Sequence, residues 1–304
     1  MNPAPYANPD ETEITPQMQQ AAKRSTWVSV VVNTILSALQ IVVGFFAQSQ
    51  ALIADGIHSL SDLLSDFVVL IAGRHSEKEA DEGHPYGHRR YENAASLVLG
   101  VLLLTVSVGM IWRAVEKFAE PDSIAQVHSI ALWVALLTLV MKEGLFRYML
   151  AAAKRVRSSM LAANAWHARS DAASSLVVAI GIVGNLMGYP LLDPLAALVV
   201  GIMVGKMGIS FGWRAFQDLM DASADEATLA RIREVIVQQP GVIGFHDLRT
   251  RKLGDMVNVD VHIEVEDTLS VVEGHDIAAR VVQQLKKLNE VISVMVHIDP
   301  RSRI

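Results

Sequence analysis

The chain has 304 residues, of which 51% are hydrophobic and 19% charged, and its mean hydropathy of +0.32 is too high for an ordinary soluble protein. It contains no cysteine, which excludes disulfides and thiolate ligands, so any transition-metal site must use histidine and carboxylate side chains. The net charge of −6, without a basic patch that includes aromatic residues, gives no indication of nucleic-acid binding.

Six windows of the sequence are apolar and long enough to cross a bilayer as helices of about 20 residues. They span residues 26–47, 51–73, 94–115, 129–150, 161–187 and 194–213. Lys and Arg gather before the first window, between the second and third, and after the fourth, with Arg113 and Lys117 as exceptions. The positive-inside rule therefore predicts that both termini are cytoplasmic. We expect a disordered tail over residues 1–20 without a cleavable signal peptide, a transmembrane domain over 21–215 and a cytoplasmic domain over 216–304.

The second window carries four ionisable residues in an otherwise apolar stretch. Asp55, His58, Asp62 and Asp66 are spaced three or four residues apart and fall on one face of a helix. Each carboxylate near a bilayer centre costs about 3 kcal/mol, so such residues usually face a bundle interior and mark an ion or proton path. The alternative is a polar stripe whose groups are satisfied by neighbouring helices.

A candidate metal site lies in the segment that joins the second and third windows. Asp81, His84 and His88 have the spacing D-x-x-H-x-x-x-H. Their three nitrogen and oxygen donors could hold one divalent ion with water as a fourth ligand, although a solvated pair of loop histidines is the alternative. In the fourth window, Lys142 and Glu143 are expected near the cytoplasmic end, where a local ion pair or snorkelling of the lysine explains them.

The fifth window repeats the spacing of the second. His167 and Asp171 form an H-x-x-x-D pair, as do His58 and Asp62, and residues four apart lie on one helix face. Both pairs are expected near the bilayer midplane, where transporters bind their substrates. Two imidazoles and two carboxylates that converge from facing helices make a site suited to tetrahedral Zn²⁺.

After the sixth window the composition becomes that of a soluble module. Its periodicities predict a helix, two strands, a helix and a strand, over residues 226–238, 242–252, 256–265, 271–287 and 291–299. This αββαβ order suits a small sheet covered by two helices on one face.

The module also contains a cluster of possible metal ligands. His297 and Asp299 are two residues apart on one strand and therefore share a face of the sheet. The other members are His246, His262 and His275. One or two could be ordinary surface residues, but together they favour a second metal centre.

These motifs resemble the cation diffusion facilitator family, and within it the dimeric bacterial zinc and ferrous-iron efflux branch. The resemblance covers nearly all of residues 20–300. The matching stretches are the two H-x-x-x-D pairs, DEGHPYGH at 81–88, FHDLRTR at 245–251, VHIEVED at 261–267, EGHDIA at 273–278 and VHIDP at 296–300. It implies a six-helix membrane bundle, a ferredoxin-like cytoplasmic domain, a homodimer and the inner membrane of a bacterium.

The resemblance also implies roles for the residues at the matching positions. The transport site would be His58, Asp62, His167 and Asp171, the loop site Asp81, His84 and His88, and the domain-interface site His246, His262, His275, His297 and Asp299. Arg90 and Asp221 stand where the family has a charge interlock between its membrane and cytoplasmic parts. The resembling branch has aspartate at the position of His58, and the second imidazole here favours Zn²⁺ over Mn²⁺ or Fe²⁺.

The function expected from the sequence is efflux of Zn²⁺ in exchange for protons by alternating access, with Cd²⁺, Co²⁺ or Fe²⁺ as alternative substrates. Asp55 and Asp66 would line the paths to the site or pair with neighbouring polar groups. A membrane metal sensor or scaffold that does not transport is the alternative from another class. An enzyme is not expected, because the sequence has no G-x-S-x-G or H-E-x-x-H motif.

Overall fold

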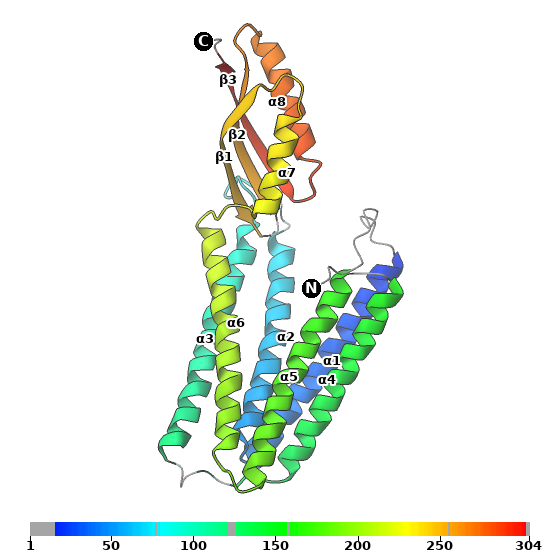
Figure 1. Ribbon diagram of the computed structural model, residues 1–304, viewed down its shortest axis with the longest axis vertical. Helices are drawn as coiled ribbons and strands as arrows, with labels where there is room; N and C mark the ends of the chain where they lie inside the picture. The colour runs from blue at the N-terminus through cyan, green and yellow to red at the C-terminus, as the bar shows by residue number, and fades with distance from the viewer. Residues whose placement is uncertain are drawn as a thin grey trace, which may run out of the picture. The chain divides into compact units, whose positions relative to one another are not determined.

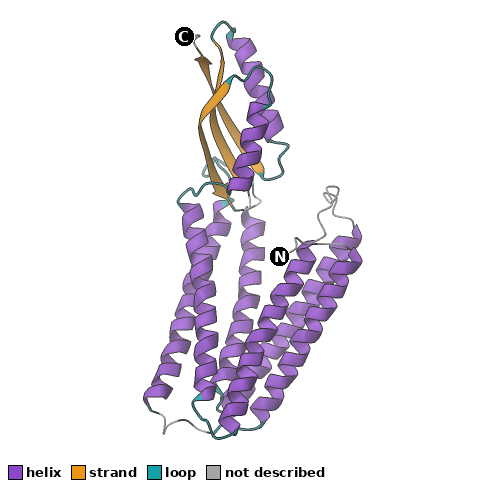
Figure 2. Cartoon of the chain, viewed as in Figure 1, coloured by secondary structure: helices purple, strands orange, loops and turns teal. Residues whose placement is uncertain are grey.

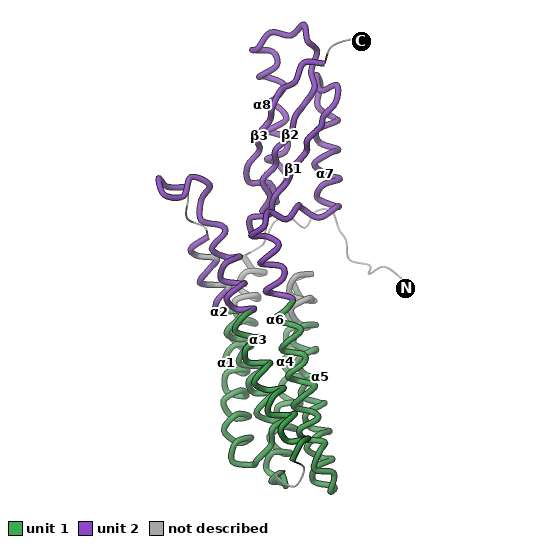
Figure 3. The backbone as a smooth tube through the Cα atoms, turned by 90° about the vertical axis from the view of Figure 1, so that its left-hand side faces the viewer, with its two compact units in different colours: residues 1–67, 101–209 green, residues 68–100, 210–304 purple. Residues whose placement is uncertain are grey.

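The computed structural model describes residues 16–76, 78, 80–120, 124, 126–156, 159–254 and 256–301. Most of the predicted N-terminal tail lies outside these ranges. The chain divides into two compact units, which Figure 3 colours separately: residues 1–67 with 101–209, and residues 68–100 with 210–304. We describe each unit by itself.

The described residues contain six long helices, and each overlaps one of the six apolar windows (Figure 1). They are α1 Pro16–Phe46, α2 Gln50–Ser76, α3 Arg90–Ala119, α4 Ile130–Val156, α5 Ser159–Leu186 and α6 Leu192–Leu219. Three segments among them are long and apolar enough to cross a membrane by length and composition, namely Arg24–Phe46, Arg90–Ala119 and Leu192–Leu219. The other three helices are α2, α4 and α5, whose apolar stretches contain the buried or partly buried residues His58, Asp62, Lys142 and Asp171.

Small side chains let the helices of the first unit approach one another closely. Its buried core is rich in alanine and valine, including Ala51, Ala179 and Ala196. A Cβ atom added to Gly181 of α5 would lie 2.5 Å from the Cβ of Ala196 and 2.8 Å from the main-chain oxygen of Leu192. Packing of this kind is typical of membrane helices, where small residues at the contact bring the backbones together.

The start of α2 is held by a side chain from α6. Asp193 accepts hydrogen bonds from the Ser49 hydroxyl at 2.6 Å, the Gln50 amide at 2.7 Å and the Ala51 amide at 3.3 Å. These amides belong to the first turn of α2, whose N–H groups have no partner within the helix. Asp193 therefore caps a helix that is far from it in the sequence, and this fixes where α2 begins.

The C-terminal module has the predicted αββαβ order. Its elements are α7 Glu226–Val237, β1 Gly244–Leu253, β2 Met256–Glu266, α8 Val271–Leu285 and β3 Val291–Arg301. The sheet has the order β1-β2-β3, with β1 antiparallel and β3 parallel to β2. Each helix begins at an N-cap residue: Asp225 accepts from the Thr228 amide, and Ser270 forms a capping box with Glu273.

Alternation along β2 separates the core of the module from its polar face. Val259, Val261 and Ile263 are buried and pack with residues such as Ile236 of α7 and Val281 of α8. Figure 2 shows both helices on one side of the sheet, as the sequence predicted. The intervening residues of β2 point to the opposite face, which the helices of this module leave uncovered.

Candidate metal centres

The helices bring three of the four predicted transport-site residues together. One ligand atom from each of His58, Asp62 and Asp171 lies within 4.8 Å of the others. His58 and Asp62 are one turn apart on α2, with 3.7 Å between Nδ1 and Oδ2, and Asp171 comes from α5. His167 lies outside this group on an exposed part of α5, although it interacts electrostatically with Asp62.

The chemistry of this group fits a divalent cation as the transported substrate. The His58 side chain is 7% exposed, and its Nδ1 has no hydrogen bond among the described residues. A buried polar atom without a partner costs free energy, whereas a lone pair bound to a metal is satisfied. Two carboxylates and an imidazole nitrogen are ligands accepted by Zn²⁺ and by other divalent first-row metals.

Asp55 and Asp66 occupy different environments on α2. Asp66 is exposed and interacts electrostatically with His167 and Asp171. Asp55 is 1% exposed, and its carboxylate is paired with the Lys142 ammonium group at 3.5 Å. Of the two roles expected for Asp55, this contact corresponds to pairing with neighbouring polar groups.

Lys142 is a residue whose role sequence reasoning missed. A local ion pair or snorkelling of the lysine was expected to explain Lys142 and Glu143. Glu143 does form a local pair, with Arg147 at 2.8 Å, but Lys142 neither pairs locally nor snorkels. The Lys142 side chain is 3% exposed and turns into the bundle. The available signal was the i,i+4 spacing of Glu143 and Arg147, which gives Glu143 a partner of its own on the same helix face.

The loop residues predicted to bind metal do come together in the second unit. The Asp81 carboxylate lies 3.3 Å from His84 Nδ1 and 3.3 Å from His88 Nε2. The main-chain amides of Gly83 and His84 also donate to Asp81, and the His84 amide is the largest cause holding the pKa of this carboxyl below its usual range. Asp81 is therefore ionised at neutral pH and faces both imidazoles, as a metal ligand should.

Strand register builds a row of three histidines across the sheet. His262 of β2 is the direct partner of His246 on β1 and of His297 on β3. Asp299, two residues after His297, contacts all three imidazoles, at 2.9 Å from His262, 3.2 Å from His246 and 3.4 Å from His297. One ligand atom from each of His246, His262 and Asp299 lies within 4.8 Å of the others.

Electrostatics favour the ionised form of Asp299 in this row. The hydrogen bond from His262 is the largest cause that lowers the pKa of the Asp299 carboxyl. His275, the remaining predicted member, does not join the cluster within one chain. It is exposed on α8, and α8 packs on the opposite face of the sheet from His262.

The predicted pair of Arg90 and Asp221 is present within the second unit. The Arg90 guanidinium donates to the Asp221 carboxylate, and both side chains are about half exposed. The pair joins the first residue of α3 to the turn after α6, where Asp221 has a positive φ of 60°. Because exposed ion pairs contribute about 1 kcal/mol or less, this contact orients the segments more than it stabilises them.

Comparison with known proteins identifies the family of the chain. Residues 26–220 match the family model of the cation efflux transmembrane domain, and residues 224–301 match that of the cation efflux protein, cytoplasmic domain. Metal tolerance protein 2 of Oryza sativa subsp. japonica is 36% identical, over 92% of this chain and 78% of the relative. Manganese efflux system protein MneP of Bacillus subtilis is 30% identical, over 93% of this chain and 98% of the relative.

Other similar proteins carry magnetosome names. Magnetosome protein MamM of Magnetospirillum gryphiswaldense is 33% identical, over 84% of this chain and 80% of the relative. This chain aligns over 25% of its length with a solved structure of the MamM-CTD, of which 98% is covered, with 31% identity and a TM-score of 0.24. The two family models together cover nearly the whole chain, and their boundary falls where α6 ends and the C-terminal module begins. The chain therefore belongs to the cation diffusion facilitator family of membrane proteins.

Proposed function

We propose that the protein exports Zn²⁺ in exchange for protons, a finer assignment than the efflux of divalent metal cations that its family membership shows. The observation that carries the proposal is the convergence of His58, Asp62 and Asp171 from two helices. His167, one turn from Asp171 on α5, completes a tetrahedral set when the metal is bound.

Charge balance supports the coupling to protons. With metal bound, the two positive charges of the ion are balanced by Asp62 and Asp171. When the ion leaves, two carboxylates remain close together in a poorly solvated place, and protonation of the site relieves that cost. Because the ligands must lose protons to bind metal, metal and protons compete for the site, and this competition is the linkage that an antiporter requires.

Mn²⁺ is the second candidate substrate. The three residues that lie together offer two carboxylates and one imidazole, a harder donor set than the predicted tetrad. A relative carries the name of a manganese efflux protein. Cd²⁺, Co²⁺ and Fe²⁺ remain alternatives, and the ligand types alone do not separate them from Zn²⁺.

The proposal includes the organisation of the protein in the membrane. Six spans cross the inner membrane of a bacterium, surrounded by lipid, and both termini are cytoplasmic. The cytoplasmic domain has a ferredoxin-like fold and joins two copies of the chain, which the name of its family model, ZT_dimer, supports. In that homodimer the loop and histidine-row sites hold metal for stability or sensing, Asp66 lines the cytoplasmic access path, and the Arg90–Asp221 pair transmits domain closure. The proposal includes no enzymatic activity for this protein.

Flux measurements on purified protein in liposomes test the proposal. Uptake of Zn²⁺, Mn²⁺, Cd²⁺, Co²⁺ and Fe²⁺ is measured with an imposed pH gradient, together with the movement of protons. Asp62→Ala and His167→Ala are expected to abolish Zn²⁺ flux and the accompanying proton movement. Glu143→Gln, which alters only a surface pair on α4, is the control and keeps both. Flux that survives in Asp62→Ala means that the site has been assigned wrongly.

The same variants separate a transporter from the sensor or scaffold. A sensor requires metal binding at the histidine row and no ligands between the membrane helices. Loss of the cellular metal-resistance phenotype in His262→Ala but not in Asp171→Ala would therefore favour the sensor. Loss in Asp171→Ala, with transport lost in the same variant in liposomes, supports the transporter.

A further inference from the structure

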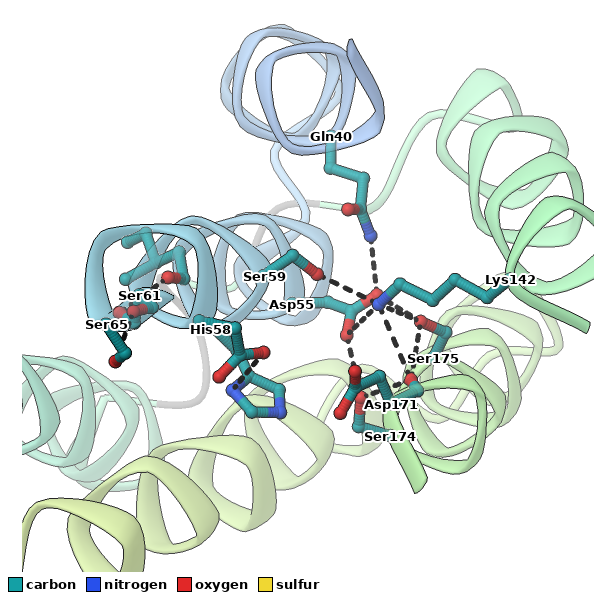
Figure 4. Close-up of polar contacts among 12 residues, drawn as sticks. Gln40, Asp55, His58, Ser59, Ser61, Ser65, Lys142, Asp171, Ser174 and Ser175 are labelled. Carbon is teal, nitrogen blue, oxygen red and sulfur yellow. Dashed lines mark hydrogen bonds and ion pairs between the residues drawn. The ribbon is translucent and has the colours of Figure 1, made fainter. Parts of the chain in front are cut away.

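A buried ion pair lies beside the transport site. The Lys142 ammonium group is 3.5 Å from Asp55 Oδ1, and the two side chains are only 3% and 1% exposed. Burying two charges is costly unless each is paired and hydrogen-bonded, so a pair of this kind requires partners from several elements. Figure 4 shows that these partners come from the two helices that carry the transport ligands, α2 and α5, and from α1, which supplies Gln40.

Lys142 of α4 bridges the two ligand-bearing helices. Its Nζ donates to Ser59 of α2 at 2.9 Å and to Ser175 of α5 at 2.8 Å, and lies 3.4 Å from the main-chain oxygen of Asp171 (Figure 4). Together with Asp55 these acceptors are enough for its three N–H bonds. The ammonium group therefore contacts Asp171 directly and contacts α2 at the residue after the ligand His58.

The Asp55 carboxylate also has hydrogen-bond donors for both of its oxygens. Its Oδ2 accepts from Gln40 of α1 at 2.5 Å and from Ser175 at 2.6 Å, and its Oδ1 accepts from Ser174 at 3.1 Å (Figure 4). A carboxylate with three hydrogen-bond donors and an ammonium group is stabilised in its ionised form. Asp55 thus presents a fully hydrogen-bonded carboxylate to Lys142.

Counting charges shows what the pair does for the site. Asp55, Asp62 and Asp171 together would offer three negative charges to an incoming cation. Lys142 cancels one of them and interacts electrostatically with Asp62 and with His58. Two negative charges remain, which match a divalent ion.

We infer that Lys142 is a charge-setting residue of the transport site: by neutralising Asp55 it leaves the site with the charge that balances one divalent cation. This inference rests on the proposed function, since it assigns the charge of the same site. It differs from a purely structural role, in which the pair would only join α1, α2, α4 and α5. The two roles predict opposite changes in Zn²⁺ affinity for Lys142→Met: an increase if the residue sets the charge, and a decrease if the pair is structural.

Removing one charge at a time gives the expected effects. Lys142→Met keeps the length of the side chain and leaves the Asp55 charge uncancelled, so the affinity for Zn²⁺ rises, by about ten-fold for a unit charge in a partly buried site. Transport then slows, because the ion is released more slowly. Asp55→Asn keeps the shape and leaves the Lys142 charge uncancelled, so the affinity falls by about ten-fold. The double substitution removes both charges and restores the affinity to within about three-fold of the original protein.

The experiment uses the full chain in liposomes and in lipid nanodiscs. The KM and the maximal rate of Zn²⁺ flux are measured in liposomes, and Zn²⁺ binding is measured in nanodiscs by competition with a fluorescent chelator. His84→Ala and His262→Ala are introduced into every binding sample to weaken the loop and histidine-row sites. Asp62→Ala identifies the binding that belongs to the transport site.

The outcomes distinguish the inference from the proposed function. If the unsubstituted chain shows no saturable Zn²⁺ flux, or Asp62→Ala retains it, the proposed function is wrong. If flux depends on Asp62 but Lys142→Met and Asp55→Asn both weaken binding, or neither changes it, the charge-setting role is wrong and the pair is structural. If Lys142→Met does not fold, Asp55→Asn and the double variant decide, because only the charge-setting role predicts weaker binding in the first and recovery in the second. If Asp55→Asn does not fold, Lys142→Met decides, because only the charge-setting role predicts that its affinity rises.

Discussion

Asp193 provides a direct test of how α2 is positioned. Its side chain is almost completely buried, and its carboxylate accepts from the Ser49 hydroxyl and from the amides of Gln50 and Ala51. Asp193→Ala removes all three bonds and leaves buried donors without a partner. We expect this substitution to destabilise the transmembrane part more than any exposed acidic residue would, because water cannot readily replace the lost acceptor.

The magnitude follows from the individual contacts. The bonds at 2.6 and 2.7 Å are short bonds to a charged acceptor, each worth about 1.5–3 kcal/mol, while the bond from Ala51 at 3.3 Å adds little. The interaction of the charge with the N-terminus of α2 is part of the same contribution. Allowing for partial hydration of the vacated space, we expect a loss of about 3–4 kcal/mol. Asp193→Asn keeps an acceptor oxygen without the charge and should lose about half as much.

Equilibrium unfolding in mixed micelles of dodecyl maltoside and SDS measures this loss. Glu226→Ala is the matched control, because Glu226 is also an acidic residue in the first turn of a helix but is exposed and pairs only with Arg233 on the surface. Its loss should be below about 1 kcal/mol. If Asp193→Ala and Glu226→Ala unfold at the same SDS fraction, the capping of α2 by α6 does not contribute as the geometry indicates.

Two further predictions concern packing and pH. Gly181→Ala should cost about 1–3 kcal/mol of stability and so lower the thermal unfolding midpoint in detergent, because the added Cβ would meet the backbone of Leu192. Gly144→Ala is the control and should leave the midpoint unchanged or raise it, because no atom lies within 4 Å of its added Cβ. Equal shifts in the two variants would contradict this prediction. The lowered pKa of Asp299 means that its contribution to stability is present above the ordinary carboxyl pKa near 4 and is lost as the pH falls through the lowered value. Asp299→Asn should therefore destabilise the metal-free protein between pH 5 and 7 and remove this part of its acid sensitivity, and an unchanged pH profile of unfolding would show that the hydrogen bond from His262 does not stabilise the fold.

Local patterns predicted most of the elements and most of the residues that the structure brings together in the candidate sites. The six helices overlap the six apolar windows, and the αββαβ order follows from alternation and helical period. The i,i+4 spacing of His58 and Asp62 is also local, because it depends only on the period of one helix. The start of α1 at Pro16 differs from the predicted window, since a helix can continue through polar residues beyond the part that is apolar.

The contacts between distant segments could not be predicted in this way. His246, His262 and His297 lie in a row only because the strands pair in one particular register, and a shift of one residue would turn His262 to the other face. The absence of His275 from that row follows from the packing of α8 on the opposite face of the sheet. The spacing of residues in the sequence predicts neither the strand register nor the face of the sheet on which α8 packs.

The sequence by itself determined which residues can bind metal and which helix or strand each belongs to, because hydropathy and periodicity are properties of neighbouring residues. Only the tertiary structure decided that Lys142 turns into the bundle, where it meets Ser59 from a segment 83 residues away and pairs with Asp55. The physical reason is that the ionised state and the partner of a buried charge depend on every helix packed around it, whereas the sequence near Lys142 shows only its own helix.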